Sequence, residues 1–172
     1  NQENLTTKEK LINTFFSLNY NHLDDLKQFK DQICTYLKEE EDYLLRDLHY
    51  ACESLIQLTT TQNPEKAQFY AKKIWERMEK FDKWYLLDIR LINTILFIFP
   101  IDVAVNIGER VTEQLVPYHN LKEAEILLIN IDINLAILLI DDKKYPEALW
   151  YLEKIISLCN KYQKYNQLEI TY

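Results

Sequence analysis

Apolar residues recur every third or fourth position along almost the whole chain, which is the spacing of one buried face of a helix. The chain has 172 residues but only one glycine, so it offers few of the tight turns that β-hairpins need. We therefore predict an all-α fold. The expected helices are 8–18, 23–37, 43–58, 64–81, 84–99, 101–116, 121–140 and 145–162, with a last helix at 166–172 that reaches the chain end.

Several helix ends carry their own signals. Thr6 or Thr7 is a plausible N-cap for the first helix, and Asn63 followed by Pro64 is typical of a helix start. The acidic run 39–42 precedes the third helix, where the helix dipole favours negative charge. A cation site at this run is the alternative interpretation.

From residue 43 onward, hydrophobic helices (43–58, 84–99, 121–140) alternate with more polar ones. The period of about 40 residues is that of tetratricopeptide-type helix hairpins. Small residues follow the prolines that open the polar helices and would let paired helices approach closely. These are Ala67, Ala71, Ala104, Gly108 and Ala148. We predict an α-solenoid of TPR-like hairpins, with N-terminal helices at 1–42 and repeats at 43–172 in one continuous domain. The first helix of each pair would line a concave groove.

The segment 121–140 is almost unbroken aliphatic, so its helix should be buried on more than one side. Asn130 and Asn134 stand four residues apart and share one face, whereas Asp132 points roughly the opposite way. Each amide offers an acceptor and two donors, which matches the peptide unit of another chain. Asn130 and Asn134 are therefore candidate peptide-binding residues, with a purely structural role as the alternative.

A second candidate set lies on the helix 84–99. Arg90, Asn93 and Phe97 are spaced i, i+3 and i+7 and so share one face. A buried Arg or Asn without a partner costs several kcal/mol, so something must satisfy these groups. A bound peptide is one answer. Internal partners, such as Asp88 or Asp132 for Arg90, are the other.

Composition excludes some classes of function. The net charge is −7, and no concentrated basic face is present to bind a phosphate backbone. Cys34, Cys52 and Cys159 show no metal-site spacing, so we interpret them as small buried hydrophobes in a reducing compartment. No segment has the pattern of a membrane span, and the chain begins without Met, like a fragment of a longer protein. We expect a cytoplasmic protein without membrane contact.

No catalytic or metal-binding motif is visible. The three histidines lie in no HExxH or Glu-x-x-His spacing, and a single glycine leaves no phosphate loop or nucleophile elbow. We expect neither an enzyme nor a bound metal or cofactor.

The stretch 78–100 contains the pattern Trp-x-x-x-Asp-x-Arg-Leu-x-Asn, and YPEALWYLEKII follows at 145–156. With the run through Asn130 and Asn134, these segments resemble the C-terminal regulatory domain of Rgg/GadR/MutR transcriptional regulators over roughly residues 43–172. The resemblance implies a peptide-pheromone-responsive, quorum-sensing regulator of Gram-positive bacteria. It also implies a homodimer, DNA contact only through an N-terminal helix-turn-helix domain absent from this chain, and a short imported peptide bound on the concave surface.

Two functions are therefore weighed. In the first, Asn93, Asn130 and Asn134 hold a peptide backbone, Arg90 pairs with a peptide carboxylate and Phe97 takes an apolar side chain. In the second, the chain is a constitutive TPR-like scaffold for a larger protein partner and senses nothing.

Overall fold

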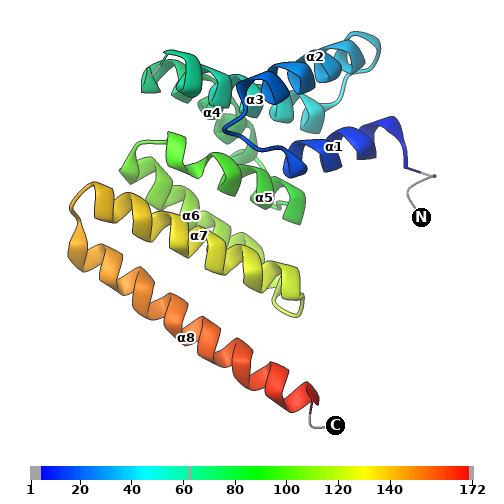
Figure 1. Cartoon of the computed structure of the whole chain (residues 1–172). Helices are drawn as coiled ribbons and strands as arrows, with labels where there is room; N and C mark the ends of the chain where they lie inside the picture. Colours follow the sequence, from blue (N-terminus) through cyan, green and yellow to red (C-terminus); the bar gives the residue numbers. More distant parts are fainter. Residues whose placement is uncertain (1–4, 62, 171–172) are drawn as a thin grey trace. The chain divides into compact units, whose positions relative to one another are not determined.

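The computed structural model describes the backbone of residues 5–61 and 63–170, with side chains up to residue 161. Every regular element in this range is helical, which confirms the predicted all-α helical-repeat fold. The chain forms two compact units, one up to Asp82 and one from Lys83 onward. The first unit contains α1 (Thr7–Ser17), α2 (Leu23–Glu39), α3 (Tyr43–Thr61) and α4 (Pro64–Met78) (Figure 1).

The helix starts of the first unit agree with the sequence signals. The Thr6 hydroxyl accepts from the Glu9 N–H at 3.2 Å, while the Glu9 carboxylate accepts from the Thr6 N–H at 2.8 Å. This reciprocal capping box satisfies two donors that the first turn cannot pair. Asn63 caps α4 in the predicted way, with its side-chain oxygen 3.0 Å from the Glu65 N–H.

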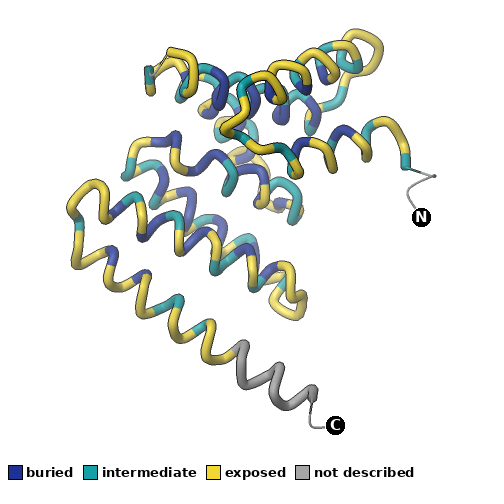
Figure 2. The backbone as a smooth tube through the Cα atoms, in the orientation of Figure 1, coloured by how far each residue is buried: buried dark blue, intermediate teal, exposed yellow. Residues whose placement is uncertain are grey.

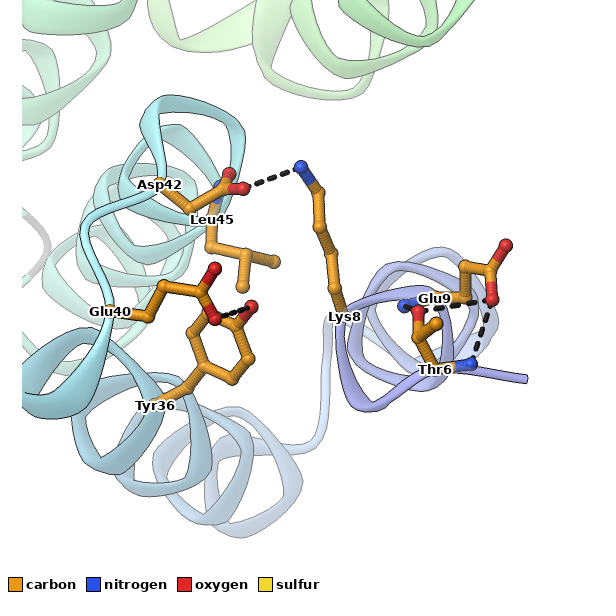
Figure 3. A network of polar contacts seen from close by, with 7 residues as sticks. All are labelled: Thr6, Lys8, Glu9, Tyr36, Glu40, Asp42 and Leu45. Atoms are coloured by element: carbon orange, nitrogen blue, oxygen red, sulfur yellow. Dashed lines mark hydrogen bonds and ion pairs between the residues drawn. The ribbon is translucent and has the colours of Figure 1, made fainter. Parts of the chain in front are cut away.

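The acidic run opens α3 as predicted. The Asp42 carboxylate accepts from the Leu45 N–H at 3.0 Å and also binds Lys8 of α1 at 2.5 Å. Figure 3 shows Lys8 reaching from α1 toward Asp42, while the Tyr36 hydroxyl of α2 donates to Glu40 at 2.7 Å. One carboxylate therefore serves both as a helix cap and as an ion-pair partner between α1 and α3.

In the first unit, α3 packs against α1, α2 and α4. Ala67 and Ala71 of α4 are fully buried, and the Ser54 hydroxyl of α3 donates to the Ala67 carbonyl, so these two helices approach closely as predicted. The same pair is joined by Asp47, 2% exposed, whose carboxylate lies 2.5 Å from the Arg77 guanidinium.

The second unit contains two short 3₁₀ turns as well as four α-helices. Its elements are α5 (Leu86–Ile95), η1 (Leu96–Ile98), α6 (Ile101–Leu115), η2 (Val116–Tyr118), α7 (Lys122–Asp141) and α8 (Tyr145–Ile170). The helix predicted at 84–99 thus begins two residues later, at Leu86. Its end tightens into η1, because Phe99 is held extended before Pro100.

The separate last helix predicted at 166–172 is wrong within the described residues. Helix α8 runs without a break through residues 163–165 to Ile170, and residues 171–172 lie outside the described part. The intervening Gln163, Lys164 and Tyr165 include neither glycine nor proline, so nothing local ends the helix.

Helix α7 packs against α5, α6 and α8. Gly108 of α6 faces Leu135 of α7 so closely that a methyl group in place of the glycine hydrogen would collide with the leucine side chain. Figure 1 shows α6 behind α5 and α7, and Figure 2 shows α7 alternating between buried and exposed positions along its length. Much of α8 up to residue 161 is exposed.

The turn between α7 and α8 stops the first helix without glycine. Lys143 has φ of 61°, the left-handed conformation, and its N–H donates to the Ile140 carbonyl at 3.0 Å. The Lys144 N–H donates to the Leu139 carbonyl at 2.8 Å, which completes a Schellman motif. The break predicted at 141–144 is therefore present, and the backbone of Lys143 is strained because a residue with a side chain disfavours this conformation.

Candidate functional site

A hydrogen bond joins two of the predicted site residues across neighbouring helices. Asn134 Nδ2 of α7 donates to Asn93 Oδ1 of α5 at 2.7 Å, and both side chains are half-buried. Neither amide makes a further hydrogen bond within the described residues. The pair therefore keeps an amide NH₂ on Asn93 and an amide oxygen on Asn134 that no neighbour uses.

The start of α5 is held in place by Trp84, which is 1% exposed. The backbone N–H of Trp84 donates to Gln114 Oε1 at 2.8 Å, and its backbone carbonyl accepts from the Tyr118 hydroxyl at 2.8 Å. The Arg110 guanidinium lies 5.5 Å from the centroid of its ring. These contacts fix the N-terminal end of α5 against α6 and η2.

The remaining residues of the same sequence pattern divide into supporting and exposed positions. Asp88 accepts from the Tyr85 N–H at 3.0 Å at the first turn of α5, and Leu91 is fully buried. Arg90 is exposed, and Asn93 lies at the edge of the α5–α7 contact. Trp84, Asp88 and Leu91 thus hold α5 in place, whereas Arg90 is left at the surface and Asn93 is half-buried beside α7.

Phe97 lies in η1 rather than in α5, so its placement on the face of Arg90 and Asn93 does not follow from α-helical spacing alone. Its side chain is 48% exposed. Asp132, one of the two internal partners considered for Arg90, is bound instead by Lys154 at 3.0 Å.

Helix α7 is buried on more than one side, as predicted, because it packs against α5, α6 and α8, but it also has one open face. Asn130 is exposed, and isoleucines spaced three and four residues apart lie along the same face. The spacing repeats every seven residues, so the exposed side chains form a single stripe. Its isoleucines are Ile126, Ile133, Ile137 and Ile140.

Sequence reasoning missed Ile133 and Ile137 as candidate site residues. They are 37% and 52% exposed and follow Asn130 by three and seven positions. That spacing was available in the sequence. However, a helix that is apolar on every side gives no indication of which isoleucines face outward. We define the α5/α7 face as the Asn93–Asn134 pair together with the exposed candidate residues on the same elements, which are Arg90 of α5, Phe97 of η1, and Asn130, Ile133 and Ile137 of α7.

Asp132 lies away from this face and has an unusual environment. It is 1% exposed, Lys154 Nζ is 3.0 Å from Oδ1, and Oδ2 has no hydrogen-bond partner among the described residues. Burial raises the pKa of this carboxyl, and the hydrogen bond and charge of Lys154 only partly oppose the effect. Asp132 and Lys154 therefore join α7 to α8 at a cost in desolvation.

The cysteines differ from one another more than predicted. Cys52 is buried and Cys34 half-buried, but Cys159 is exposed on α8, so its interpretation as a buried hydrophobe is wrong. Burial raises the pKa of the Cys52 thiol well above its usual range. Among the described residues, no three His, Cys, Asp or Glu side chains are grouped so that they could hold a metal ion. None of the helices in this part of the chain has the length and apolar character needed to cross a bilayer.

Comparison with known proteins identifies a family. Residues 31–172 match the family model described as the C-terminal domain of the HTH-type transcriptional regulator Rgg. The match begins in α2 and includes every residue of the α5/α7 face. Searches of curated proteins and of solved structures found no match.

Proposed function

Because this chain belongs to the Rgg family, as the C-terminal domain of an HTH-type transcriptional regulator, we propose that it is the regulatory domain that binds a short signalling peptide. The peptide would lie on the α5/α7 face. DNA contact would belong to the helix-turn-helix domain, and this chain would act in the cytoplasm by binding rather than by catalysis.

The observation that carries the proposal is the Asn93–Asn134 hydrogen bond of 2.7 Å. It orients two amides and leaves them with unused donors and an unused acceptor at the surface. A peptide unit presents the complementary acceptor and donor. Asn130, exposed one turn away on α7, would extend the same contact to the next peptide unit.

Arg90 supports the proposal through charge. It is exposed on α5 nearly one turn before Asn93, so a peptide that runs along α5 passes its guanidinium. A charge-assisted, bidentate hydrogen bond to a carboxylate is among the stronger polar contacts in proteins. We assign Arg90 to a carboxylate of the peptide.

The apolar members of the face would supply most of the affinity. Phe97, Ile133 and Ile137 are between 37% and 52% exposed, a large apolar surface for side chains that a peptide could cover. Complete burial of such a side chain is worth about 1.5–3 kcal/mol, and covering the exposed part is worth roughly half of that. A short apolar peptide is therefore the ligand class that fits.

Calorimetric titration with synthetic short apolar peptides, each with a free C-terminal carboxylate, tests the site. We expect binding that is lost in Asn130→Ala/Asn134→Ala and weakened about tenfold in Ile137→Glu, which changes an exposed side chain. Asn106→Ala, an exposed asparagine on α6, is the matched control. Arg90→Gln should lose its effect when the peptide ends in an amide. Full binding by the double asparagine variant would show that the site lies elsewhere.

Peptide binding would act on a homodimer by changing the relative orientation of its subunits. We assign self-association to an apolar stripe on α8 formed by Tyr145, Leu149, Leu152 and Ile156, whose 4–3–4 spacing suits packing against another helix. Sedimentation of the protein and of Leu152→Glu tests this assignment. Equal association of both would rule it out.

The same α8 stripe favours the alternative function, a constitutive scaffold for a larger protein partner. A scaffold would bind its partner in the absence of peptide and would give no heat with the apolar peptides. A folded protein that binds none of them would favour the scaffold.

A further inference from the structure

A cleft of about 430 Å³ lies between α6 and α8. Asp102 and Glu109 line it from α6, where their spacing of seven places them on one face. Glu147, Trp150 and Tyr151 line it from the first two turns of α8. None of these residues belongs to the α5/α7 face.

The cleft carries an excess of negative charge. Lys144 also lines it, but its ammonium is already engaged by Asp102 at 3.3 Å and by Asp142 at 3.2 Å. Glu109 and Glu147 are exposed, and neither forms an ion pair within the part of the chain that the structure describes. The carboxylates of Glu109 and Glu147 therefore line the cleft without an ion-pair partner among the described residues.

Tyr151 adds a polar group to the wall of the cleft. It is 8% exposed and lines the cleft, yet its hydroxyl makes no hydrogen bond among the described residues. Burial, with the charges of Asp132 and Glu109, raises the pKa of Tyr151, so the hydroxyl stays protonated at neutral pH. A hydroxyl placed in this way can accept a hydrogen bond from a group that enters the cleft.

Trp150 gives the cleft an aromatic wall. Its side chain is 57% exposed, and its ring meets the Tyr151 ring edge-on at 4.8 Å between centroids. The Trp150 ring already attracts a cation, since Lys154 Nζ lies 5.5 Å from the ring centroid. The charge of Lys154 is balanced by Asp132. An exposed indole beside free carboxylates is well suited to a planar cation.

We propose that this cleft binds the guanidinium of an arginine side chain on a partner polypeptide. The guanidinium would stack on Trp150 and donate to Glu109, Glu147 and the Tyr151 hydroxyl. An ammonium fits less well, because it is strongly hydrated, cannot stack and has fewer donors to reach three acceptors. This assignment is independent of the proposed peptide function, since it uses a different surface.

The experiment is an NMR titration of the protein with acetyl-Gly-Arg-Gly-amide, followed at the indole N–H of Trp150. Trp84, 1% exposed, is the internal control. The same peptide with citrulline in place of arginine keeps the shape without the charge, and a lysine peptide keeps the charge without the plane. Glu109→Gln/Glu147→Gln removes both free carboxylates, Tyr151→Phe removes only the hydroxyl, and Glu113→Gln is a matched change on α6 outside the cleft.

We expect the arginine peptide to shift the Trp150 signal, with little response to citrulline. The dissociation constant should rise at least tenfold in the double glutamine variant and severalfold in Tyr151→Phe, with no change in Glu113→Gln. A Trp150 signal that does not move, or an unchanged constant in the double variant, would overturn the proposal. Equal binding of the lysine peptide would overturn the guanidinium assignment, and tighter binding of free agmatine would overturn the assignment to a polypeptide.

Discussion

Lys154 of α8 donates to Asp132 of α7 at 3.0 Å, and the two partners differ sharply in exposure. The carboxylate side chain is 1% exposed, whereas the lysine side chain is 26% exposed. Asp132 is therefore desolvated on folding, while Lys154 keeps part of its contact with water. The balance between the two explains why the pKa of Asp132 is raised despite the nearby cation.

Asp132→Asn should not destabilise the protein at neutral pH. A raised pKa means that Asp132 contributes stability below its ordinary pKa of 3.8, which is lost as the pH rises through its pKa in the folded state. Asparagine has no such loss. The difference in unfolding free energy between variant and parent should therefore increase from pH 4 to pH 7, as measured by urea unfolding.

Lys154→Met is the contrasting change, because it leaves the buried carboxylate without its partner. We expect a loss of about 3–5 kcal/mol at pH 7. A large loss in Asp132→Asn as well would show that the ion pair stabilises the fold in spite of desolvation.

Gly108→Ala should destabilise the protein although alanine favours helices. The gain in helix propensity is about 1 kcal/mol, but the added methyl group collides with Leu135 in a packed core, which costs about 1–3 kcal/mol. When Leu135 is first replaced by alanine, the collision disappears and Gly108→Ala should become stabilising by about 1 kcal/mol. A double-mutant cycle in urea measures this change of sign. The same effect in both backgrounds would mean that the close approach is not limiting.

Replacements at Asp42 should separate its two roles. Burial is the largest single influence on its pKa and raises it, but the hydrogen bonds from Lys8 and from the Leu45 N–H outweigh burial, so the pKa is lowered. Asp42→Asn keeps the helix cap and loses the ion pair, at a cost of about 0.5 kcal/mol. Asp42→Ala loses both, at about 1–2 kcal/mol.

Lys8→Met should match Asp42→Asn in urea unfolding at pH 7. The lowered pKa places the contribution of Asp42 above pH 3.8, and it should fade as the pH falls through its pKa in the folded state. Additive losses in the Lys8→Met/Asp42→Asn double variant would show that the two side chains do not interact.

Lys143→Gly should stabilise the turn between α7 and α8. Lys143 has φ of 61°, which costs a residue with a side chain about 1–2 kcal/mol. Glycine removes this strain and loses about 0.5–1 kcal/mol in chain entropy, so a net gain of about 0.5–1 kcal/mol is expected in thermal unfolding. Asp142→Gly is the matched control, because Asp142 has φ of −82° and should gain nothing.

The three thiols should react with Ellman's reagent in the order of their exposure. Cys159 is exposed, Cys34 half-buried and Cys52 buried with a raised pKa. One fast thiol that disappears in Cys159→Ser is expected, and Cys52 should react only on unfolding. Fast reaction of two thiols in the Cys159→Ser protein would contradict the buried position of Cys52.

The helices could be predicted from the sequence because their signals are local. Asn63 and Pro64 are the N-cap and the first residue of α4, as their sequence predicts, and Thr6 is the N-cap of α1. Local signals were misleading where backbone geometry depends on more than spacing. Pro100 tightened the end of α5 into a 3₁₀ turn, and α8 continued through residues 163–165, where a break between two helices was predicted.

The candidate site could be predicted only in part. The pairing of Asn134 with Asn93 joins residues 41 positions apart, and one-dimensional spacing does not reveal which helices become neighbours. The open face of α7 was hidden for a related reason: isoleucine occupies both its packed and its exposed sides. The α6/α8 cleft was missed because its acidic and aromatic residues come from two helices that α7 separates in the sequence, so they form a group only after the three helices pack.

A partner that covers the exposed stripe on α8, as we propose, would also lengthen the lifetime of the protein. The surface of Leu149, Leu152 and Ile156 is assembled only in the folded chain, so a molecule that covers it binds the folded state alone. Such binding shifts the folding equilibrium toward the native state by mass action. Chains that lack this partner open more often and meet proteases more often. The cellular level of the regulator would then follow the supply of its partner, even at a constant rate of synthesis.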